Sequence, residues 1–211
     1  MTTQATQAMY PVQFAVDYPD RPLNRLTSAF RIFVAIPILI VLGTVSGSSG
    51  WSGETAVAMS GAGGVLFLGP LLMILFRRKY PRWWFDWNLE FERFSNRVVV
   101  YLALMDDRYP STDEQQSVHL DIAYPDASRD LNRWLPLVKW LLVIPHFIVL
   151  VFLSIAALVV VVMTWFAILF TGRYPRGMFT FVEGVLRWGQ RVIAYAFLLV
   201  TDRYPPFSLA A

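Results

Sequence analysis

Apolar residues in this chain are gathered into long runs, which polar and mostly basic segments separate. Two runs of helical length, 28–45 and 57–76, are followed by one run of about 36 residues, 135–170. A single helix of that last length would extend about 54 Å, whereas the hydrocarbon layer of a membrane is roughly 30 Å thick. The pattern therefore predicts two membrane-crossing helical hairpins, 28–76 and 135–170, the second with a break near Ser154.

Each predicted hairpin is followed by a segment that is too polar to cross a membrane. In 179–200, the residues Glu183, Arg187 and Arg191 recur at four-residue steps, which places them on one face of a helix. The corresponding segment after the first hairpin is 85–104. We expect both segments to be amphipathic helices that lie in the cytoplasmic membrane interface.

Short extended segments are predicted before both hairpins. Val12–Tyr18 and Val118–Tyr124 alternate apolar and mixed residues, a pattern that is typical of strands. We expect these two segments to pair with each other.

An internal repeat accounts for this layout. Val16–Asp20 returns as Ile122–Asp126, and each half closes on Asp-Arg-Tyr-Pro, at Asp107–Pro110 and at Asp202–Pro205. Matches that recur in the same order indicate a tandem duplication. The predicted domains are repeat 1, residues 1–110, and repeat 2, residues 111–211.

Composition and charge favour a membrane protein and orient it. Hydrophobic residues make up 56% of the chain and charged residues only 16%, against about 25% charged residues in soluble domains. The loops inside the hairpins, including a Gly/Ser-rich insert at about 43–64, contain none of the 18 lysines and arginines. By the positive-inside rule, both termini and the central segment are cytoplasmic. The predicted fold class is an all-α membrane protein with four transmembrane helices in two tandem hairpins.

Basic residues beside the hairpins are the candidates for binding. A cluster just past a helix end attracts anionic headgroups, although the same residues can serve only to set the topology. The arginines of the two amphipathic segments form intrahelical ion pairs or, alternatively, converge on one anionic headgroup. The candidate contacts for anionic lipid or a partner are Arg77, Arg78, Lys79, Arg82, Arg93, Arg97, Arg173, Arg176, Arg187 and Arg191.

His146 is a polar candidate inside a predicted span, where histidine is functional by default. No second histidine or carboxylate lies near it in the sequence, so a packing hydrogen bond or an interfacial position is the alternative to a proton relay. The chain has no cysteine and no nucleophile, nucleotide-binding or zinc motif. We therefore expect no catalytic residue, no metal, no cofactor and no binding to nucleic acid.

Tyrosine precedes proline at seven positions, and two interpretations remain open for these pairs. Tyrosine suits the headgroup layer and proline stiffens a turn, so they can be interfacial turns at the ends of elements. They can also form an aromatic cluster that binds a ligand. The positions are Tyr10, Tyr18, Tyr80, Tyr109, Tyr124, Tyr174 and Tyr204.

The second half carries several motifs that belong together. They are Tyr124-Pro125, Lys139–His146, Gly172–Phe179, Arg187-Trp188, Arg191-Val192 and Thr201–Leu209. These motifs resemble a bacterial membrane family catalogued as a domain of unknown function (four-three-eight-nine). The first half departs from the pattern, with Trp83-Trp84 in place of Gly-Met and Ile38 in place of the histidine. The resemblance implies two tandem copies, the first diverged, in a multi-pass protein of the bacterial inner membrane, without an assigned activity.

The function expected from the sequence is that of a non-enzymatic membrane protein. It would be a structural or accessory subunit that contacts anionic phospholipid and other membrane proteins or copies of itself. The alternative is a small channel or lipid-handling protein that uses the basic cytoplasmic interface. The accessory role follows from the missing catalytic motifs together with the amphipathic cytoplasmic segments.

Overall fold

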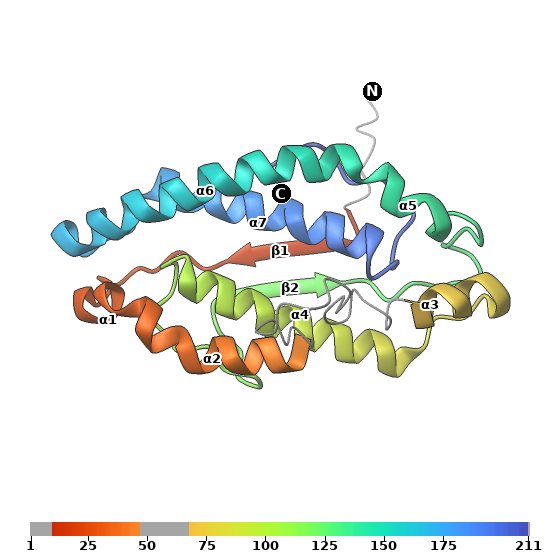
Figure 1. Ribbon diagram of the computed structural model, residues 1–211, viewed down its shortest axis with the longest axis horizontal. Coiled ribbons are helices and arrows are strands. Elements are labelled where there is room, and N and C mark those ends of the chain that lie inside the picture. Colours follow the sequence, from red (N-terminus) through yellow and green to blue (C-terminus); the bar gives the residue numbers. More distant parts are fainter. Residues whose placement is uncertain (1–9, 47–67, 211) are drawn as a thin grey trace, which may run out of the picture.

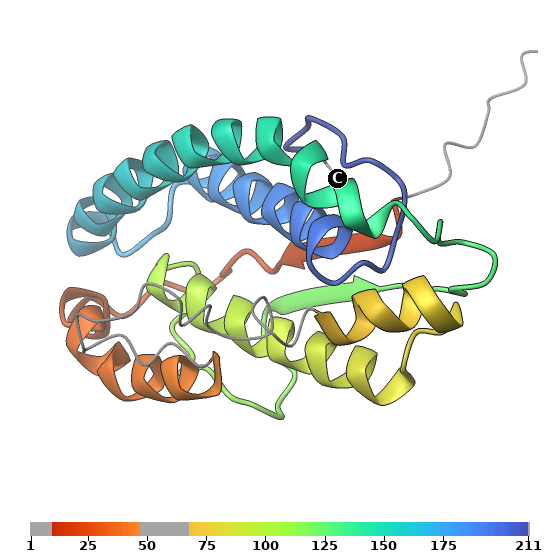
Figure 2. The ribbon, with the colours of Figure 1, turned by 45° about the vertical axis from the view of Figure 1, so that its right-hand side comes forward.

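The computed structural model describes residues 10–46 and 68–210, which form helices around one small sheet (Figure 1). The two strands lie in the middle, with α6 and α7 to one side and α2 and α4 to the other (Figure 1 and Figure 2). In chain order the elements are β1 (Val12–Val16), α1 (Arg25–Ala29), α2 (Arg31–Ser46), α3 (Leu68–Leu72), the π-helix η3 (Met73–Arg77), α4 (Arg82–Leu102), β2 (Val118–Ile122), α5 (Pro136–Leu142), α6 (Ile144–Thr171) and α7 (Arg176–Ala196).

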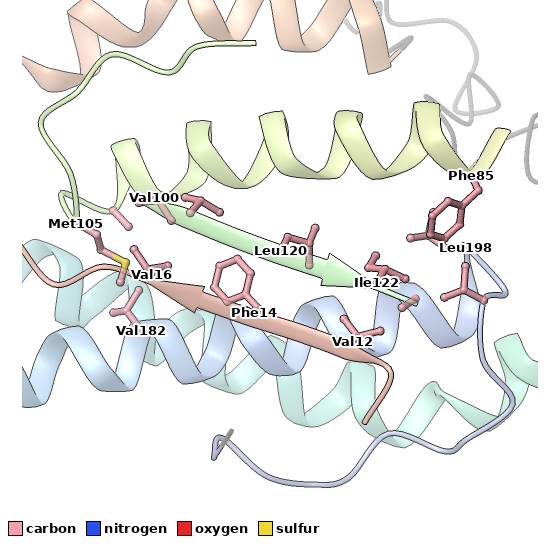
Figure 3. Close-up of a cluster of buried hydrophobic side chains, with 14 of the residues drawn as sticks. Val12, Phe14, Val16, Phe85, Val100, Met105, Leu120, Ile122, Val182 and Leu198 are labelled. Atoms are coloured by element: carbon pink, nitrogen blue, oxygen red, sulfur yellow. The ribbon is translucent and has the colours of Figure 1, made fainter. Parts of the chain in front are cut away.

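The two expected strands are present and pair with each other, as predicted. They run antiparallel, with Phe14 opposite Leu120 at the centre of the register. Successive side chains of a strand point to opposite faces, so the apolar residues of both strands gather on one face. That face packs against α4 and α7 to form the main core (Figure 3). The core side chains include Val12, Phe14, Val16, Phe85, Val100, Met105, Leu120, Ile122, Val182 and Leu198.

The helices α4 and α7 form a middle layer rather than an outer surface. α7 packs on β1 and is covered by α5 and α6, whereas α4 packs on β2 and is covered by α2. Phe94 and Val98 of α4 meet Ala35 of α2 in a separate apolar cluster. The amphipathic patterns expected over 85–104 and 179–200 are therefore used for packing inside the molecule, and the place of these helices relative to a membrane stays a prediction.

Both middle-layer helices end a few residues before the predicted ends at 104 and 200. The apolar pattern continues past each helix, but the backbone turns at Leu104 and Leu199, which have φ values of 64° and 56°. A left-handed residue ends a helix because the next amide can no longer reach the carbonyl four residues earlier. The apolar tail after each helix thus folds back onto the core.

The predicted helix break near Ser154 is wrong, because α6 runs without interruption from Ile144 to Thr171. The break lies earlier, at Val143, between α5 and α6. Pro145 falls in the first turn of α6, where its missing N–H removes no helical hydrogen bond. From there to Thr171 no proline or glycine interrupts the run, so nothing in the backbone favours a turn at Ser154.

The first half has a shorter outer layer in the part of the chain that the structure describes. α2 covers most of the first predicted helix, 28–45, and α3 with η3 covers the end of the second, 57–76. Pro37 lies inside α2. Most of the Gly/Ser-rich insert falls at 47–67, outside the described residues.

Corresponding residues of the two halves make corresponding contacts. The Tyr18 hydroxyl donates to the carbonyl of Tyr174, and the Tyr124 hydroxyl donates to the carbonyl of Tyr80, both at 2.5 Å. The segment between the strand and the first helix of each half thus contacts the other half. The two tyrosines that accept these bonds are themselves buried, and burial raises the pKa of Tyr174 to about 12. In these two Tyr-Pro pairs the tyrosine ring therefore packs in the core, and the place of the turns relative to a membrane stays a prediction.

Candidate functional site

The outer surface of α6 is almost entirely apolar. Among the described residues, α6 is the one helix long and apolar enough to cross a membrane, with 28 residues and a mean hydropathy of 3.1 over its most apolar 18-residue stretch. Its length is about 42 Å. One face packs on α7, while the rest exposes large side chains such as Phe152 at 69% and Leu158 at 65%. α2 is similar, with Ile32 at 75%. Continuous exposed apolar surface of this kind marks contact with a membrane or another protein.

Six of the ten predicted basic contacts are exposed, and they lie at two turns. The η3–α4 turn and the α6–α7 turn lie at opposite ends of the long axis of the molecule (Figure 1). Each turn places one guanidinium over a tyrosine of the other half, Arg82 over Tyr124 at 4.7 Å and Arg176 over Tyr18 at 4.8 Å. The exposed set is Arg77, Arg78, Lys79, Arg82, Arg173 and Arg176.

Arg93 and Arg187 cap the outer edges of the two strands. Arg187 Nε donates to the Phe14 carbonyl at 2.8 Å, and Arg93 Nε donates to the Leu120 carbonyl at 3.0 Å. The two acceptors are the residues that face each other at the centre of the sheet. An exposed strand edge can pair with another chain, so a guanidinium on that edge closes it.

Arg97 and Arg191 hold the segments that follow α4 and α7. Arg97 donates to the carbonyls of Ser111 and Thr112, and Arg191 to those of Ser208 and Ala210. Both side chains are buried, with 7% and 5% exposed, and burial lowers the pKa of Arg191.

All four arginines of the amphipathic segments are therefore internal tethers in this structure. They bind backbone carbonyls from the strands and from the segments after the helices, and the four guanidinium groups do not meet at one point. Arg187 and Arg191 of α7 also border an open groove. The predicted intrahelical ion pairs are present beside these bonds, at 2.7 Å for Glu90–Arg93 and 2.5 Å for Glu183–Arg187.

Two buried ion pairs were not predicted from the sequence. Arg31 contacts Asp107 at 2.5 Å, and Lys139 contacts Asp202 at 2.7 Å. The basic side chains are 3% and 0% exposed, so each opening helix is fixed to the Asp-Arg-Tyr-Pro motif that ends its own half. The sequence contains an indication of these pairs, because the basic residue and the acidic residue each occur at corresponding places in both halves. The two members of a pair are more than sixty residues apart, so local spacing does not connect them.

A polar contact lies at the centre of the molecule. Gln190 Nε2 donates to Asn96 Oδ1 at 3.1 Å, and these two residues correspond in the repeat. Corresponding residues also face each other at Phe14 and Leu120. An approximate twofold axis therefore passes through the sheet and between α4 and α7. Beside it, burial raises the pKa of Glu92, although a hydrogen bond with Gln190 offsets part of this effect.

His146 is fully buried in a group of aromatic rings. Trp188 Nε1 donates to His146 Nδ1 at 3.0 Å, and Phe207 stacks on the imidazole with 3.9 Å between ring centroids. Since Nδ1 accepts, the proton of the neutral ring is on Nε2, which has no hydrogen-bond partner. No carboxylate binds the ring in the described part of the chain, so the packing interpretation fits this geometry better than a proton relay.

Replacing Trp188 by phenylalanine removes the donor to His146 while keeping an aromatic ring. We expect the free energy of unfolding to fall by about 1–3 kcal/mol, because His146 Nδ1 is left buried and unpaired. Thermal unfolding of the purified protein measures this loss. In the double variant with His146→Ile, which places there the residue found at position 38, part of the loss should be recovered. A double variant less stable than Trp188→Phe alone would contradict the pairing.

An open groove of about 890 Å³ lies over the polar face of the sheet. The side chains that line it include Gln13, His119, Arg187, Arg191, Arg203 and Tyr204. The His119 imidazole lies 3.0 Å from Asp17, and both side chains are more than half exposed. Within residues 10–46 and 68–210, no group of three or more His, Asp or Glu side chains is arranged to hold a metal ion. This face of the molecule is thus polar and water-accessible.

Comparison with known families agrees with the resemblance of the second half. Residues 134–208 match the model of a domain of unknown function, DUF4389. The match spans α5, α6 and α7 and the tail that Arg191 holds, and it includes His146. No curated protein and no solved structure matches the chain. The family description carries no activity, so the geometry has to support any functional conclusion.

Proposed function

We propose that this protein is an integral membrane protein whose outer helices lie in the bilayer and whose sheet faces the cytoplasm. The observation that carries the proposal is the exposed apolar surface of α5 and α6, together with that of α2, each on the side of a middle-layer helix away from the sheet. Water would meet more than twenty large apolar side chains on these helices if they were not covered. A surface of this extent is costly in water and favourable in hydrocarbon.

The charge distribution supports an orientation with the long axis along the membrane. The sheet itself lies between the two ends of this axis (Figure 1). Exposed charged groups such as Glu90 and Asp121 lie beside the sheet, where both pair with Arg93, and their side chains are 58% and 78% exposed. If the axis crossed the bilayer, each would lie in hydrocarbon, at about 2.5–3.5 kcal/mol per charge. With the axis in the membrane plane, the approximate twofold is the membrane normal and both basic turns meet the cytoplasmic headgroups.

We infer a structural or accessory role that includes contact with anionic phospholipid. Most of the strongest polar contacts bind one part of the chain to another: the four tether arginines and the two buried ion pairs all act within the molecule. The exposed basic residues at the two turns are then the groups that are left to attract headgroups. We also infer that both halves are copies of one unit and that the membrane is the bacterial inner membrane.

The proposal is tested with single cysteines, since the chain has none of its own. Ser128→Cys, in the segment before α5, and Thr171→Cys, the last residue of α6, should both react with an impermeant maleimide from the cytoplasmic side only. Phe152→Cys should be protected until the membrane is dissolved. Labelling of positions 128 and 171 from opposite sides would show a single crossing and overturn the orientation.

Two placements of α6 satisfy the first two labelling results. The helix can lie along the cytoplasmic leaflet, as its continuity favours, or open in the bilayer into the hairpin expected from the sequence. Ser154→Cys separates them, because only a hairpin brings this position to the outer surface. Phe152→Cys that reacts in intact membranes from the cytoplasmic side would contradict both placements.

A further inference from the structure

The two basic turns differ in charge and in aromatic content. The α6–α7 turn contains Thr171 and Gly172, whereas the corresponding positions in the η3–α4 turn are Arg77 and Arg78. The second residue of the next helix is Trp83 in the first half and Gly177 in the second half. Positions that hold small or neutral residues in the second half thus hold cationic or aromatic residues in the first half.

The backbone at Arg78 is strained, and the strain points to a role for its side chain. Arg78 has φ 50°, and the corresponding Gly172 has φ 72°. This left-handed conformation closes the helix, because the Arg78 amide bonds to the Ile74 carbonyl. Glycine adopts it without penalty, while a residue with a Cβ loses about 1–2 kcal/mol. Folding alone would therefore favour glycine at position 78, and a strained residue at a surface turn is a sign of function.

The side chains of this turn form an exposed cationic surface beside an aromatic one. No carboxylate among the described residues pairs with Arg77, Arg78 or Lys79, and the one ion pair nearby, Arg82–Asp86, is more than half exposed on both sides. Trp83 is 70% exposed. Tryptophan next to lysine and arginine is typical of the headgroup layer, where the ring lies among the glycerol groups and the cations meet phosphate.

A short aromatic stack continues this surface along α4. Trp87 is 41% exposed and stacks on Phe91, with 5.5 Å between centroids and 1° between the planes. The corresponding residues of α7 are Phe181 and Val185, and Val185 is buried. The aromatic surface therefore exists in the first half only.

We propose that the η3–α4 turn is a binding site for the phosphate headgroup of an anionic phospholipid, with no equivalent at the α6–α7 turn. Arg77, Arg78 and Lys79 supply the positive charge, and Trp83 covers the glycerol region of the lipid. The proposal deepens the one above and rests on it, because it needs this end of the molecule to lie at a membrane surface.

The test compares lipid binding with stability in the same variants of the full chain. Dioctanoyl-phosphatidylglycerol is titrated into the detergent-solubilised protein, and binding is measured by native mass spectrometry. Arg78→Gly should bind about fivefold more weakly, and Arg77→Thr/Arg78→Gly about 25-fold more weakly, from about 1 kcal/mol for each basic residue. Arg78→Gly should at the same time raise the melting temperature, because it relieves the left-handed strain.

The matched control is the other turn, and dioctanoyl-phosphatidylcholine is the control lipid. Arg173→Gln/Arg176→Gln should weaken phosphatidylglycerol binding far less than Arg77→Thr/Arg78→Gly does, and phosphatidylcholine should bind weakly to every variant. Equal losses of phosphatidylglycerol binding in the variants of the two turns would mean that general surface charge, and not a site at one turn, attracts the lipid. That result would overturn the proposal. Tight binding of soluble glycerol phosphate would show that the site recognises a free phosphate compound rather than a lipid, and this result would also overturn the proposal. If the cysteines report membrane insertion but Arg78→Gly binds lipid normally, this site fails while the proposed function stands.

Discussion

Replacement of Lys139 by methionine should lower the free energy of unfolding by about 3–5 kcal/mol. The ammonium group is fully buried, lies 2.7 Å from an Asp202 carboxylate oxygen and donates to the Thr201 carbonyl. Removing it leaves a carboxylate with only 19% of its side chain exposed and no counter-charge from α5. Chemical or thermal unfolding of the purified protein measures the loss.

Two further variants show whether the buried pair is the cause. Lys139→Met/Asp202→Asn removes both charges and should recover at least half of the loss, because no unpaired ion is left. Arg129→Met breaks the exposed Arg129–Asp126 pair, with N···O 3.8 Å and the arginine 85% exposed. That substitution should change the stability by less than about 0.5 kcal/mol. A large loss in Arg129→Met, or no recovery in the double variant, would argue against the assigned cause.

Arg187→Gln should be the second most damaging of these substitutions, at about 2–4 kcal/mol. One guanidinium binds the carbonyls of Phe14 and Leu209 and the carboxylate of Glu183. The Arg187 and Glu183 side chains are only 11% and 14% exposed, so water cannot replace these bonds fully. Loss of the tether should also release the C-terminal segment, which limited proteolysis detects as earlier cleavage.

Arg93→Gln is the matched comparison in the other half. Arg93 binds the Leu120 carbonyl in the same way, but its carboxylate partners Glu90 and Asp121 are 58% and 78% exposed. Exposed ion pairs contribute little, so this variant should lose about 1–1.5 kcal/mol, mostly from the single carbonyl bond. Losses of equal size in the two arginine variants would mean that burial does not govern these tethers.

The pattern of apolar and polar residues predicted where the elements lie. Alternation over Val12–Tyr18 and Val118–Tyr124 located both strands, and the repeat indicated that they pair. Helical periodicity located α4 and α7 within a few residues. These predictions succeed because side-chain alternation and helical periodicity are local properties that a single segment carries by itself.

The length of an apolar run did not predict the position of the helix break correctly. The run 135–170 is longer than a membrane-crossing helix needs, and its length therefore predicted a helix break near Ser154. In the structure Val143 ends α5, and α6 then packs along α7 over most of its length. A helix that lies against another helix has no length limit set by the bilayer, so the packing partner decided where the break occurs.

By itself, the sequence determined the order of the strands and main helices and the long apolar runs that form the exposed apolar surface. Only the tertiary structure decided the partners of the charged residues. Arg187 binds a carbonyl at Phe14, 173 positions away, and Lys139 binds Asp202, 63 positions away by their numbers. Backbone carbonyls are the same at every residue and leave no mark in the sequence, so only the fold shows which arginines are internal tethers and which remain exposed to bind a ligand.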